Sequence, residues 1–333
     1  MSAAHAEERA TDAHEAPDGS PRVAHGAYCR GPLDGPRTQA RERQFGLAGA
    51  FTYVACSRCE SLHLERPPED LAPYYPREYY SLATTPATGP VRMLHERALH
   101  WAVTGRGLSA RAAAWIAPPS FGAVHRWLRR AGTRLGDRVL DVGSGRGALL
   151  RAMRAAGYRD LTGVDPFLEE DEVVEGLRLL RRSIEDVDDG PYDLVMLHHS
   201  LEHVRSPEAT LRGVRRVLRD GGHVLVRVPI VPSAAWRRYG AAWVQLDAPR
   251  HLTVPSERGL TELASRVSLA LEAVEHDSSP VQFWASELYE RGITLSEGVA
   301  RLGYLARRRG MARARRLNAA RQGDQAAFLF RGA

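Results

Sequence analysis

The pattern of apolar residues changes character near Arg138. From there to the C-terminus, short apolar runs alternate with segments of helical spacing, as strands and helices do in α/β proteins. The runs expected to be strands are RVLDVG, LTGVD, LRLLRRSI, YDLVMLHH, HVLVRVP, LEAVEH and AAFLF. Their almost continuous apolar cores indicate strands that are buried on both faces. The pattern therefore predicts an α/β fold with a doubly wound, mainly parallel, seven-stranded sheet.

Helix boundaries are marked by capping residues. Ser206 followed by Pro207 is typical of a helix start, and we expect the Gly221–Gly222 pair to close that helix. A second start is expected at Ser256, and Gly157 is a plausible C-terminal cap for the helix that begins after Gly147.

The chain before Arg138 divides into three segments. Residues 1–24 are polar and rich in Pro and acidic residues, so we expect a disordered tail. Residues 25–80 hold all three cysteines and form a small module, and residues 91–134 look like a helical lead-in. The α/β domain is expected to cover residues 135–333.

Composition narrows the class of protein. Hydrophobic residues make up 44% and charged residues 26% of the chain, as in soluble globular proteins. No apolar run is long enough to span a membrane, and the first residues do not resemble a secretory signal. Three cysteines, an odd number, argue against a disulfide framework, so we expect a reducing, cytoplasmic location. The oligomeric state is not indicated.

The most informative segment is VLDVGSGRGA, residues 139–148. Gly143, Gly145 and Gly147 stand between a predicted strand and a predicted helix, where they allow a tight turn and close approach of a ligand to the backbone. Asp165 ends the next strand, 18 residues after Gly147. A carboxylate at about this offset binds the ribose hydroxyls of a nucleotide. The segment therefore predicts a nucleotide site at the carboxyl ends of the strands.

Two nucleotide classes fit this loop. Ala148 completes a G-x-G-x-x-[G/A] pattern, so a dinucleotide such as NAD(P) remains open. Asp141, however, precedes the first glycine by two residues. A carboxylate there offers nothing to a pyrophosphate but attracts a ligand that carries an ammonium and a sulfonium.

The order of the sequence blocks resembles the class I S-adenosylmethionine-dependent methyltransferases. The blocks are DVGSGRG, GVD (163–165), YDLV (192–195), HSLEHV (199–204) and LRDGGHVLV (218–226). The resemblance implies a Rossmann-like methyltransferase fold with S-adenosyl-L-methionine as cofactor. The cofactor-binding residues that it implies are Asp141, Gly143, Ser144, Gly145, Gly147, Asp165, Pro166, Ile184, Glu185 and His198. Many relatives have an Asp at the position of Ser183, so here the adenine contact is expected from the backbone near Ile184.

Histidines follow the fourth predicted strand. His199 and His203 are candidate catalytic residues, and His203 is a candidate general base because imidazole titrates near neutral pH. Alternatively, Glu202 and His203 only orient the loop by hydrogen bonds. A metal site is a third possibility, since His199, Glu202 and His203 are all ligand types on one short turn.

A second candidate loop, WVQLDAPRHL (243–252), follows the fifth predicted strand. His251 is a candidate base, Arg250 a candidate anion clamp, and Trp243 a candidate stacking surface for a substrate ring. A packed lid without catalytic residues is the alternative. This loop is similar to the W-x-x-L-D-x-P-R-H-L block of a methyltransferase subfamily found with sugar, glycan and natural-product pathways.

The cysteine segment contains a C-x-x-C pair, Cys56 and Cys59, at a spacing typical of zinc knuckles. Cys29 is the remaining cysteine, and a fourth ligand would have to be His25 or His63. The segment resembles the zinc-ribbon-like leader of sugar-type methyltransferases, but those carry two complete pairs. Two interpretations therefore remain open. The module binds zinc through Cys29, Cys56, Cys59 and a histidine, or it is a metal-free remnant.

Three functions compete at this stage. The favoured one is a methyltransferase that acts on a small molecule, with a sugar, glycan-linked or secondary-metabolite acceptor. An NAD(P)-dependent oxidoreductase would use the same glycine loop. A nucleic-acid-binding protein would fit the net charge of +6, but the chain lacks a recognisable reader motif, so no nucleic acid or membrane partner is expected.

Overall fold

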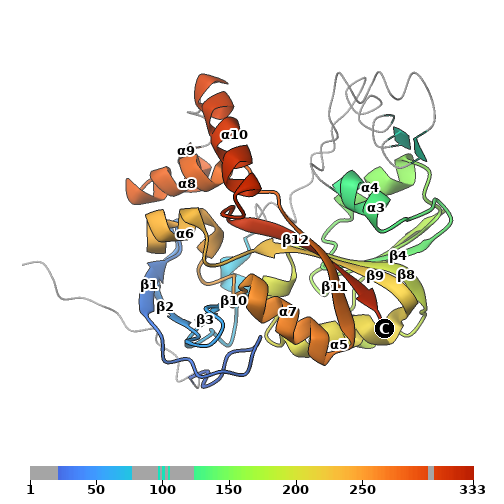
Figure 1. Cartoon of the computed structure of the whole chain (residues 1–333), viewed down its shortest axis with the longest axis horizontal. Coiled ribbons are helices and arrows are strands. Elements are labelled where there is room, and N and C mark those ends of the chain that lie inside the picture. The colour runs from blue at the N-terminus through green and yellow to red at the C-terminus, as the bar shows by residue number, and fades with distance from the viewer. Residues whose placement is uncertain (1–21, 77–96, 98–99, 102–103, 106–123, 299–303) are drawn as a thin grey trace, which may run out of the picture.

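The computed structural model describes residues 22–76, 97, 100–101, 104–105, 124–298 and 304–333 (Figure 1). Residues 1–21 of the predicted tail and most of the predicted helical lead-in lie outside these ranges. Residues 22–24 of that tail are described, and Val23 donates a backbone hydrogen bond to Glu65. The described part contains an eight-stranded sheet with helices on both faces and a separate four-stranded sheet. Within it, no helix is long and apolar enough to cross a bilayer.

The large sheet has the strand order β11-β12-β9-β8-β4-β5-β7-β6. Its strands are β4 (Arg138–Val142), β5 (Asp160–Val164), β6 (Glu172–Val174), β7 (Leu177–Leu180), β8 (Tyr192–His198), β9 (Leu218–Pro229), β11 (Leu269–His276) and β12 (Gln325–Gly332). The five strands from β9 to β7 are mutually parallel, whereas β12 runs antiparallel to both of its neighbours. The glycine loop follows β4, in the centre of the parallel strands.

The predicted strand count is corrected from seven to eight, and the sheet is mixed rather than mainly parallel. All seven expected strands are present, and the additional one is β6, which pairs antiparallel with β7. It is only three residues long, its Val173 and Val174 are exposed, and the reversal uses the left-handed Gly176. A short, exposed edge strand leaves no apolar pattern in the sequence.

The helices are α3 (Val124–Arg130), α4 (Ala148–Ala155), α5 (Pro207–Val217), α6 (Ala234–Tyr239), α7 (Glu257–Arg266), α8 (Val281–Glu290), α9 (Leu295–Gly298) and α10 (Tyr304–Ala319). Short 3-10 turns are η1 (Ala72–Tyr74), η2 (Ile184–Asp186), η3 (Leu201–His203), η4 (Gly240–Ala242) and η5 (Val244–Leu246). In Figure 1, α5 and α7 cover one face of the large sheet, and α3 and α4 cover the other.

Successive strand residues belong to different cores, as burial on both faces requires. Leu140 and Val195 pack with α5 and α7, whereas their neighbours Val139 and Leu194 pack with α3 and α4. The prediction of a doubly wound sheet is confirmed by this division. The carboxyl ends of the central strands therefore lie together at one edge of the sheet, where a ligand site can form.

Two helix starts agree with the sequence. The Ser206 and Ser256 hydroxyls accept hydrogen bonds from the backbone of Ala209 and Gly259, at the N-termini of α5 and α7. The predicted helix end at Gly221–Gly222 is wrong, because α5 ends at Val217 and the glycines lie inside β9. Strand β9 starts immediately after the helix, so no glycine cap is needed there.

The smaller sheet has the order β1-β2-β3-β10, with all neighbours antiparallel. Its strands are β1 (Arg37–Arg41), β2 (Ala50–Ala55), β3 (Leu62–Leu64) and β10 (Thr253–Val254). Strand β10 comes from the α/β part of the chain and pairs Thr253 with His63. The cysteine module therefore shares a sheet with the segment that follows the candidate loop 243–252.

Candidate active site

The glycine loop turns sharply between β4 and α4. Gly143, Gly145 and Gly147 all have left-handed φ values, of 75°, 51° and 71°. A Cβ atom placed on Gly143 would lie 2.4 Å from the Cβ of Ser200, so this loop packs directly on the turn that follows β8. Side chains are excluded there for steric reasons, and the loop backbone remains open to a ligand.

Asp165, at the end of β5, holds the loop in place. Its Oδ2 accepts a hydrogen bond from the Gly145 amide at 2.8 Å, and its Oδ1 accepts one from the Phe167 amide at 2.9 Å. A carboxylate has about four lone-pair positions, so ribose hydroxyls can still bind to both oxygens. Pro166 follows on the same turn, next to the exposed ring of Phe167. The structure thus places Asp165 and Pro166 beside the predicted glycine loop.

Asp141 is a buried carboxylate, and one of its oxygens is unpaired in the described part of the chain. Only 3% of the residue is exposed, and Oδ1 has no hydrogen-bond partner among the described residues. Burial, with a smaller contribution from the negative charge of Asp165, raises the pKa of Asp141 to about 8. A buried carboxylate of this kind is stabilised by a cation. A sulfonium or ammonium ligand fits this position, and a pyrophosphate does not.

The predicted adenine segment follows β7, on the far side of β5. Ser183 caps the turn η2, and its Oγ lies 2.8 Å from the Asp186 carboxylate. Ile184 is buried, whereas Glu185 is exposed. Because Ser183 uses its hydroxyl within the turn, an adenine contact there would come from the backbone and from Ile184.

His198 and His199 end β8 but have different surroundings. His198 Nε2 is buried and has no hydrogen-bond partner within the described ranges, and burial followed by the charge of Arg227 lowers the pKa of His198 to about 3. His199 has both ring nitrogens occupied: Nε2 accepts from Arg227 at 3.2 Å, and Nδ1 therefore donates to Glu202 at 3.2 Å. With no free nitrogen, His199 orients Glu202 and is poorly placed to act as a base.

Glu202 lies at the centre of the histidine cluster and is completely buried. Burial opposes ionisation, but the hydrogen bond from His199 and the neighbouring His251 and His203 outweigh it and lower the pKa of Glu202 to about 2. Its Oε2 has no partner among the residues described. The cluster therefore contains a permanent negative charge next to two imidazoles.

His203 and His251 approach each other edge to face, with ring centroids 4.6 Å apart. His203 Nδ1 lies 3.0 Å from the Arg250 carbonyl, and His251 Nδ1 lies 2.8 Å from the Gln245 carbonyl. A carbonyl oxygen can only accept, so each Nδ1 carries a proton. Burial lowers the pKa of His203 to about 4, which keeps this ring neutral at physiological pH.

The loop 243–252 differs from expectation in two residues. Arg250 is fully buried between carboxylates, with Glu42 at 2.7 Å and Asp247 at 2.5 Å, so it is not a free anion clamp. Trp243 is 1% exposed and donates to Asp324, so it is a core residue and not a stacking surface. Buried charges must be paired and buried indoles must be hydrogen-bonded, which explains both arrangements.

Three candidate ligand residues for a metal ion come together, but not the predicted set. Suitable atoms of Glu202, His203 and His251 lie within 4.8 Å of one another. The sequence had grouped His199 with Glu202 and His203. The Nε2 atom of His199 instead accepts a hydrogen bond from Arg227.

Several residues of the cluster were not found from the sequence. Tyr75 places its hydroxyl 2.9 Å from His203 Nδ1, and Tyr53 donates to the His251 carbonyl at 2.7 Å. Glu42 forms the buried pair with Arg250. All three lie in the first 76 residues, far along the chain from the loops that they contact in the fold. Only the density of aromatic residues around Tyr75 gave a hint.

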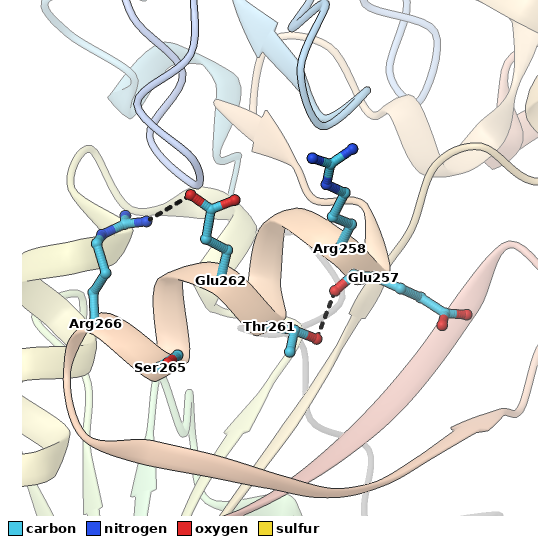
Figure 2. Close-up of a pocket in the computed structure, with 6 residues that line it drawn as sticks. All are labelled: Glu257, Arg258, Thr261, Glu262, Ser265 and Arg266. Carbon is cyan, nitrogen blue, oxygen red and sulfur yellow. Dashed lines mark hydrogen bonds and ion pairs between the residues drawn. The ribbon is translucent and has the colours of Figure 1, made fainter.

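A shallow pocket on α7 has no evident link to this cluster. Its six lining residues come from the one helix, and they bond among themselves, through Thr261 to Glu257 and through Arg266 to Glu262 (Figure 2). No strand end contributes to it. We therefore place the candidate active site at the ends of β4, β5 and β8 and not at this pocket.

The three cysteines are unpaired, buried and adjacent. The Sγ atoms of Cys29, Cys56 and Cys59 lie within 4.8 Å of one another. The fold therefore brings the three candidate ligand cysteines together, and their binding of a metal stays a prediction.

Comparisons with known proteins agree with the glycine-loop interpretation. The family model described as "Methyltransferase domain" matches residues 119–274. A ubiquinone biosynthesis O-methyltransferase from Bordetella avium is 35% identical over 179 residues, which cover 45% of this chain and 73% of that protein. The corresponding protein of Pectobacterium atrosepticum is 30% identical over 135 residues, 37% of this chain and 56% of its own length.

Solved structures show looser likenesses. A complex between the Haloferax volcanii Trm112 methyltransferase activator and the putative methyltransferase gives a TM-score of 0.44 at 19% identity, over 70% of this chain and 96% of that one. A Burkholderia thailandensis 1,6-didemethyltoxoflavin-N1-methyltransferase with bound S-adenosylhomocysteine gives a TM-score of 0.40 at 16% identity, over 75% and 93%. The oxidoreductase alternative finds no support among the family and sequence matches, and the chain belongs to the S-adenosylmethionine-dependent methyltransferases.

Proposed function

We propose that this enzyme methylates a hydroxyl oxygen of a small-molecule acceptor and that His203 removes the acceptor's proton. The observation that carries the proposal is the neutral imidazole of His203, which lies edge to face with His251 beside the ionised Glu202 and is packed against the glycine loop through Ser200. A hydroxyl must lose its proton to become a good nucleophile, and a neutral imidazole can accept it.

The cofactor site supports the same reaction. When bound, S-adenosylmethionine would supply the methyl group, which would pass in line to the acceptor oxygen as its bond to sulfur breaks, with S-adenosylhomocysteine as the leaving group. Asp141 is the residue suited to the positive charge, because its Oδ1 is buried and unpaired. We assign the ribose to Asp165, and the adenine to the segment of Ile184 and Glu185. Gly143, Ser144, Gly145 and Gly147 would then line the methionine moiety with backbone.

His203 fits the role of base better than its neighbour. His203 is partly exposed, whereas only 3% of His251 is accessible. Its Nδ1 proton is fixed by the Arg250 carbonyl, so the free Nε2 can receive a proton from the acceptor. The resulting imidazolium would be stabilised by Glu202. We assign His251 to positioning, through its edge-to-face contact with His203.

The acceptor class is proposed from the names of the relatives and from an aromatic rim beside His203. The relatives are named for ubiquinone biosynthesis and O-methylation, which favours a hydroxyl as the methyl acceptor. We extend the proposal to a phenolic hydroxyl on an otherwise hydrophobic aromatic compound. Tyr75 and Phe167, stacked with centroids 5.7 Å apart, offer an aromatic rim next to His203. The expectation of a sugar, glycan-linked or secondary-metabolite acceptor has no support in these names and stays a prediction. A methyl-transfer screen with catechols, nucleotide sugars and polyketide phenols separates the classes.

The test of the base is a comparison of three alanine variants. We expect His203→Ala to lower kcat by about 10²–10⁴-fold, the usual contribution of a general base, while the calorimetric affinity for S-adenosylhomocysteine stays unchanged. His251→Ala should lower kcat less. His223→Ala is the matched control, because His223 lies within β9 opposite Leu194, near the start of β8, and pairs with Glu272. Normal turnover of His203→Ala would refute the assignment.

A bound cation is the second candidate for activating the hydroxyl. The convergence of Glu202, His203 and His251 favours it, since imidazole and carboxylate together suit several divalent metals. Turnover that is lost on chelation and restored by Mg²⁺ or Mn²⁺ would support this role, because thiolate sites do not select these ions. Turnover that survives chelation would leave His203 as the base.

A further inference from the structure

Two turns in the N-terminal module repeat the same geometry. In the first, the Gly26 amide donates to the Gly31 carbonyl at 2.8 Å, and the Arg30 amide donates to the Gly26 carbonyl at 2.9 Å. In the second, Cys56 and Ser61 form the equivalent bond at 2.9 Å, and Glu60 donates to Cys56 at 2.8 Å. The fifth residue of each turn is left-handed, with φ of 56° at Arg30 and 66° at Glu60.

Residue-by-residue alignment of the two turns leaves the first turn one thiol short. Cys29 corresponds to Cys59, and Gly26 corresponds to Cys56, so the first turn lacks its first thiol. The three thiols that remain converge, with Cys29 Sγ and Cys56 Sγ 3.4 Å apart. Two turns of this kind facing each other are the usual frame of a four-ligand zinc site.

His63 lies beside the place of the missing thiol, outside the group of three thiols whose Sγ atoms are within 4.8 Å of one another. A Cβ atom built on Gly26 would lie 3.2 Å from His63 Nε2 and 3.6 Å from Cys56 Sγ. His63 is 1% exposed, and its Nε2 has no hydrogen-bond partner among the described residues. An unpaired, buried imidazole nitrogen costs free energy unless a ligand satisfies it. The other candidate from the sequence, His25, is exposed.

We propose that the module binds one Zn²⁺ through Cys29 Sγ, Cys56 Sγ, Cys59 Sγ and His63 Nε2. Binding replaces the thiol protons by metal–sulfur bonds and uses the free lone pair of the imidazole, so the protons are released to solvent. Four protein ligands close the coordination shell, which makes the ion structural and not catalytic. The Gly31 amide, 3.3 Å from Cys29 Sγ, is a ready donor to a thiolate.

The position of His63 also connects the proposed ion to the loop 243–252. His63 belongs to β3 and is paired with Thr253 of β10, two residues after His251. The metal would therefore fix the register between the cysteine module and the loop that carries the candidate active site. The proposal is independent of the reaction chemistry, since neither the ligands nor the test involve methyl transfer.

The test is the zinc content and affinity of the full-length protein, purified under reducing conditions, by elemental analysis and competition with a chromogenic chelator. We expect one zinc per chain. His63→Ala should weaken the affinity by more than about tenfold, the lower bound set by the loss of mere outer-shell partners. His25→Ala is the matched control and should bind zinc as the natural chain does.

A rescue variant separates ligation from folding. Adding Gly26→Cys to His63→Ala completes the first C-x-x-C pair and should restore tight binding, with a more intense sulfur-to-metal charge-transfer band after substitution by Co²⁺. The inference is overturned if the natural chain binds no zinc, if Cys29 and Cys56 are found as a disulfide, if His63→Ala keeps full affinity, or if Gly26→Cys fails to restore it.

Discussion

Replacing Asp141 by Asn isolates the charge on which cofactor recognition depends. The amide keeps the shape of the side chain but cannot ionise. In the ligand-free protein the pKa of Asp141 rises from 3.8 to about 8, mainly through burial. This shift of about four units is equivalent to about 6 kcal/mol between the protonated and ionised forms, at about 1.4 kcal/mol per unit.

The sign of the linkage follows from the raised pKa. Between about pH 4 and pH 8 the folded protein keeps a proton that the unfolded chain has released, so stability falls by about 1.4 kcal/mol per pH unit relative to Asp141→Asn. This stabilisation of the natural chain relative to Asp141→Asn is complete below about pH 4 and is lost as the pH reaches about 8. Urea unfolding of both proteins at about pH 5 and about pH 7 should show a relative change of about 3 kcal/mol.

Cofactor binding should depend on pH in the opposite sense. A cationic ligand selects the ionised carboxylate, so the affinity of the natural chain for S-adenosylmethionine should rise about tenfold per unit up to about pH 8, with release of a proton. The ligand's own α-amino group titrates near about pH 8, and the Asp141→Asn variant corrects for it. Calorimetry in two buffers of different ionisation enthalpy measures the released proton. Identical pH profiles for both proteins would refute the assignment of Asp141.

Three further measurements test other parts of the site. Asp165→Asn should weaken cofactor binding by about tenfold or more, the value of a charge-assisted hydrogen bond, and unchanged calorimetric affinity would remove Asp165 from the site. Glu42→Gln leaves the buried charge of Arg250 with Asp247 alone, so the free energy of unfolding should fall by about 3 kcal/mol in urea titrations; an unaltered midpoint would contradict the buried pair. Since burial lowers the pKa of His203 to about 4, kcat at saturating cofactor should stay level from about pH 8 down to about pH 6. A decline within that interval would show that another group is the base.

The parallel core could be predicted because its signals are local. Asp141 and Asp165 were placed at strand ends from apolar runs of five residues and from the glycines between them. Each such run is buried on both faces, so its composition alone identifies it. The edge strand β6 lacks this property, and the Gly221–Gly222 pair gave a misleading signal because glycine is common both at helix ends and in turns within strands.

The acceptor side of the site was harder to predict because its contacts are long-range. Arg250 reads from the sequence as an available cation, but its partner Glu42 lies 208 residues away in the chain. Which of His199, His203 and His251 keeps a free nitrogen also depends on carbonyl and guanidinium groups supplied by the fold. The sequence shows residue types, whereas tautomers and burial are properties of the assembled structure.

The pairing of β3 with β10 constrains how the chain can be divided. The first 66 residues supply the edge to which Thr253 and Val254 bond, and they bury Tyr28 and Val54 in the same apolar cluster as Leu260 of α7. A shortened protein that starts at the helical lead-in would expose this apolar surface and the open edge of β10, both of which favour aggregation. Attempts to isolate the catalytic half, or to exchange it between relatives, should therefore transfer the cysteine module along with it.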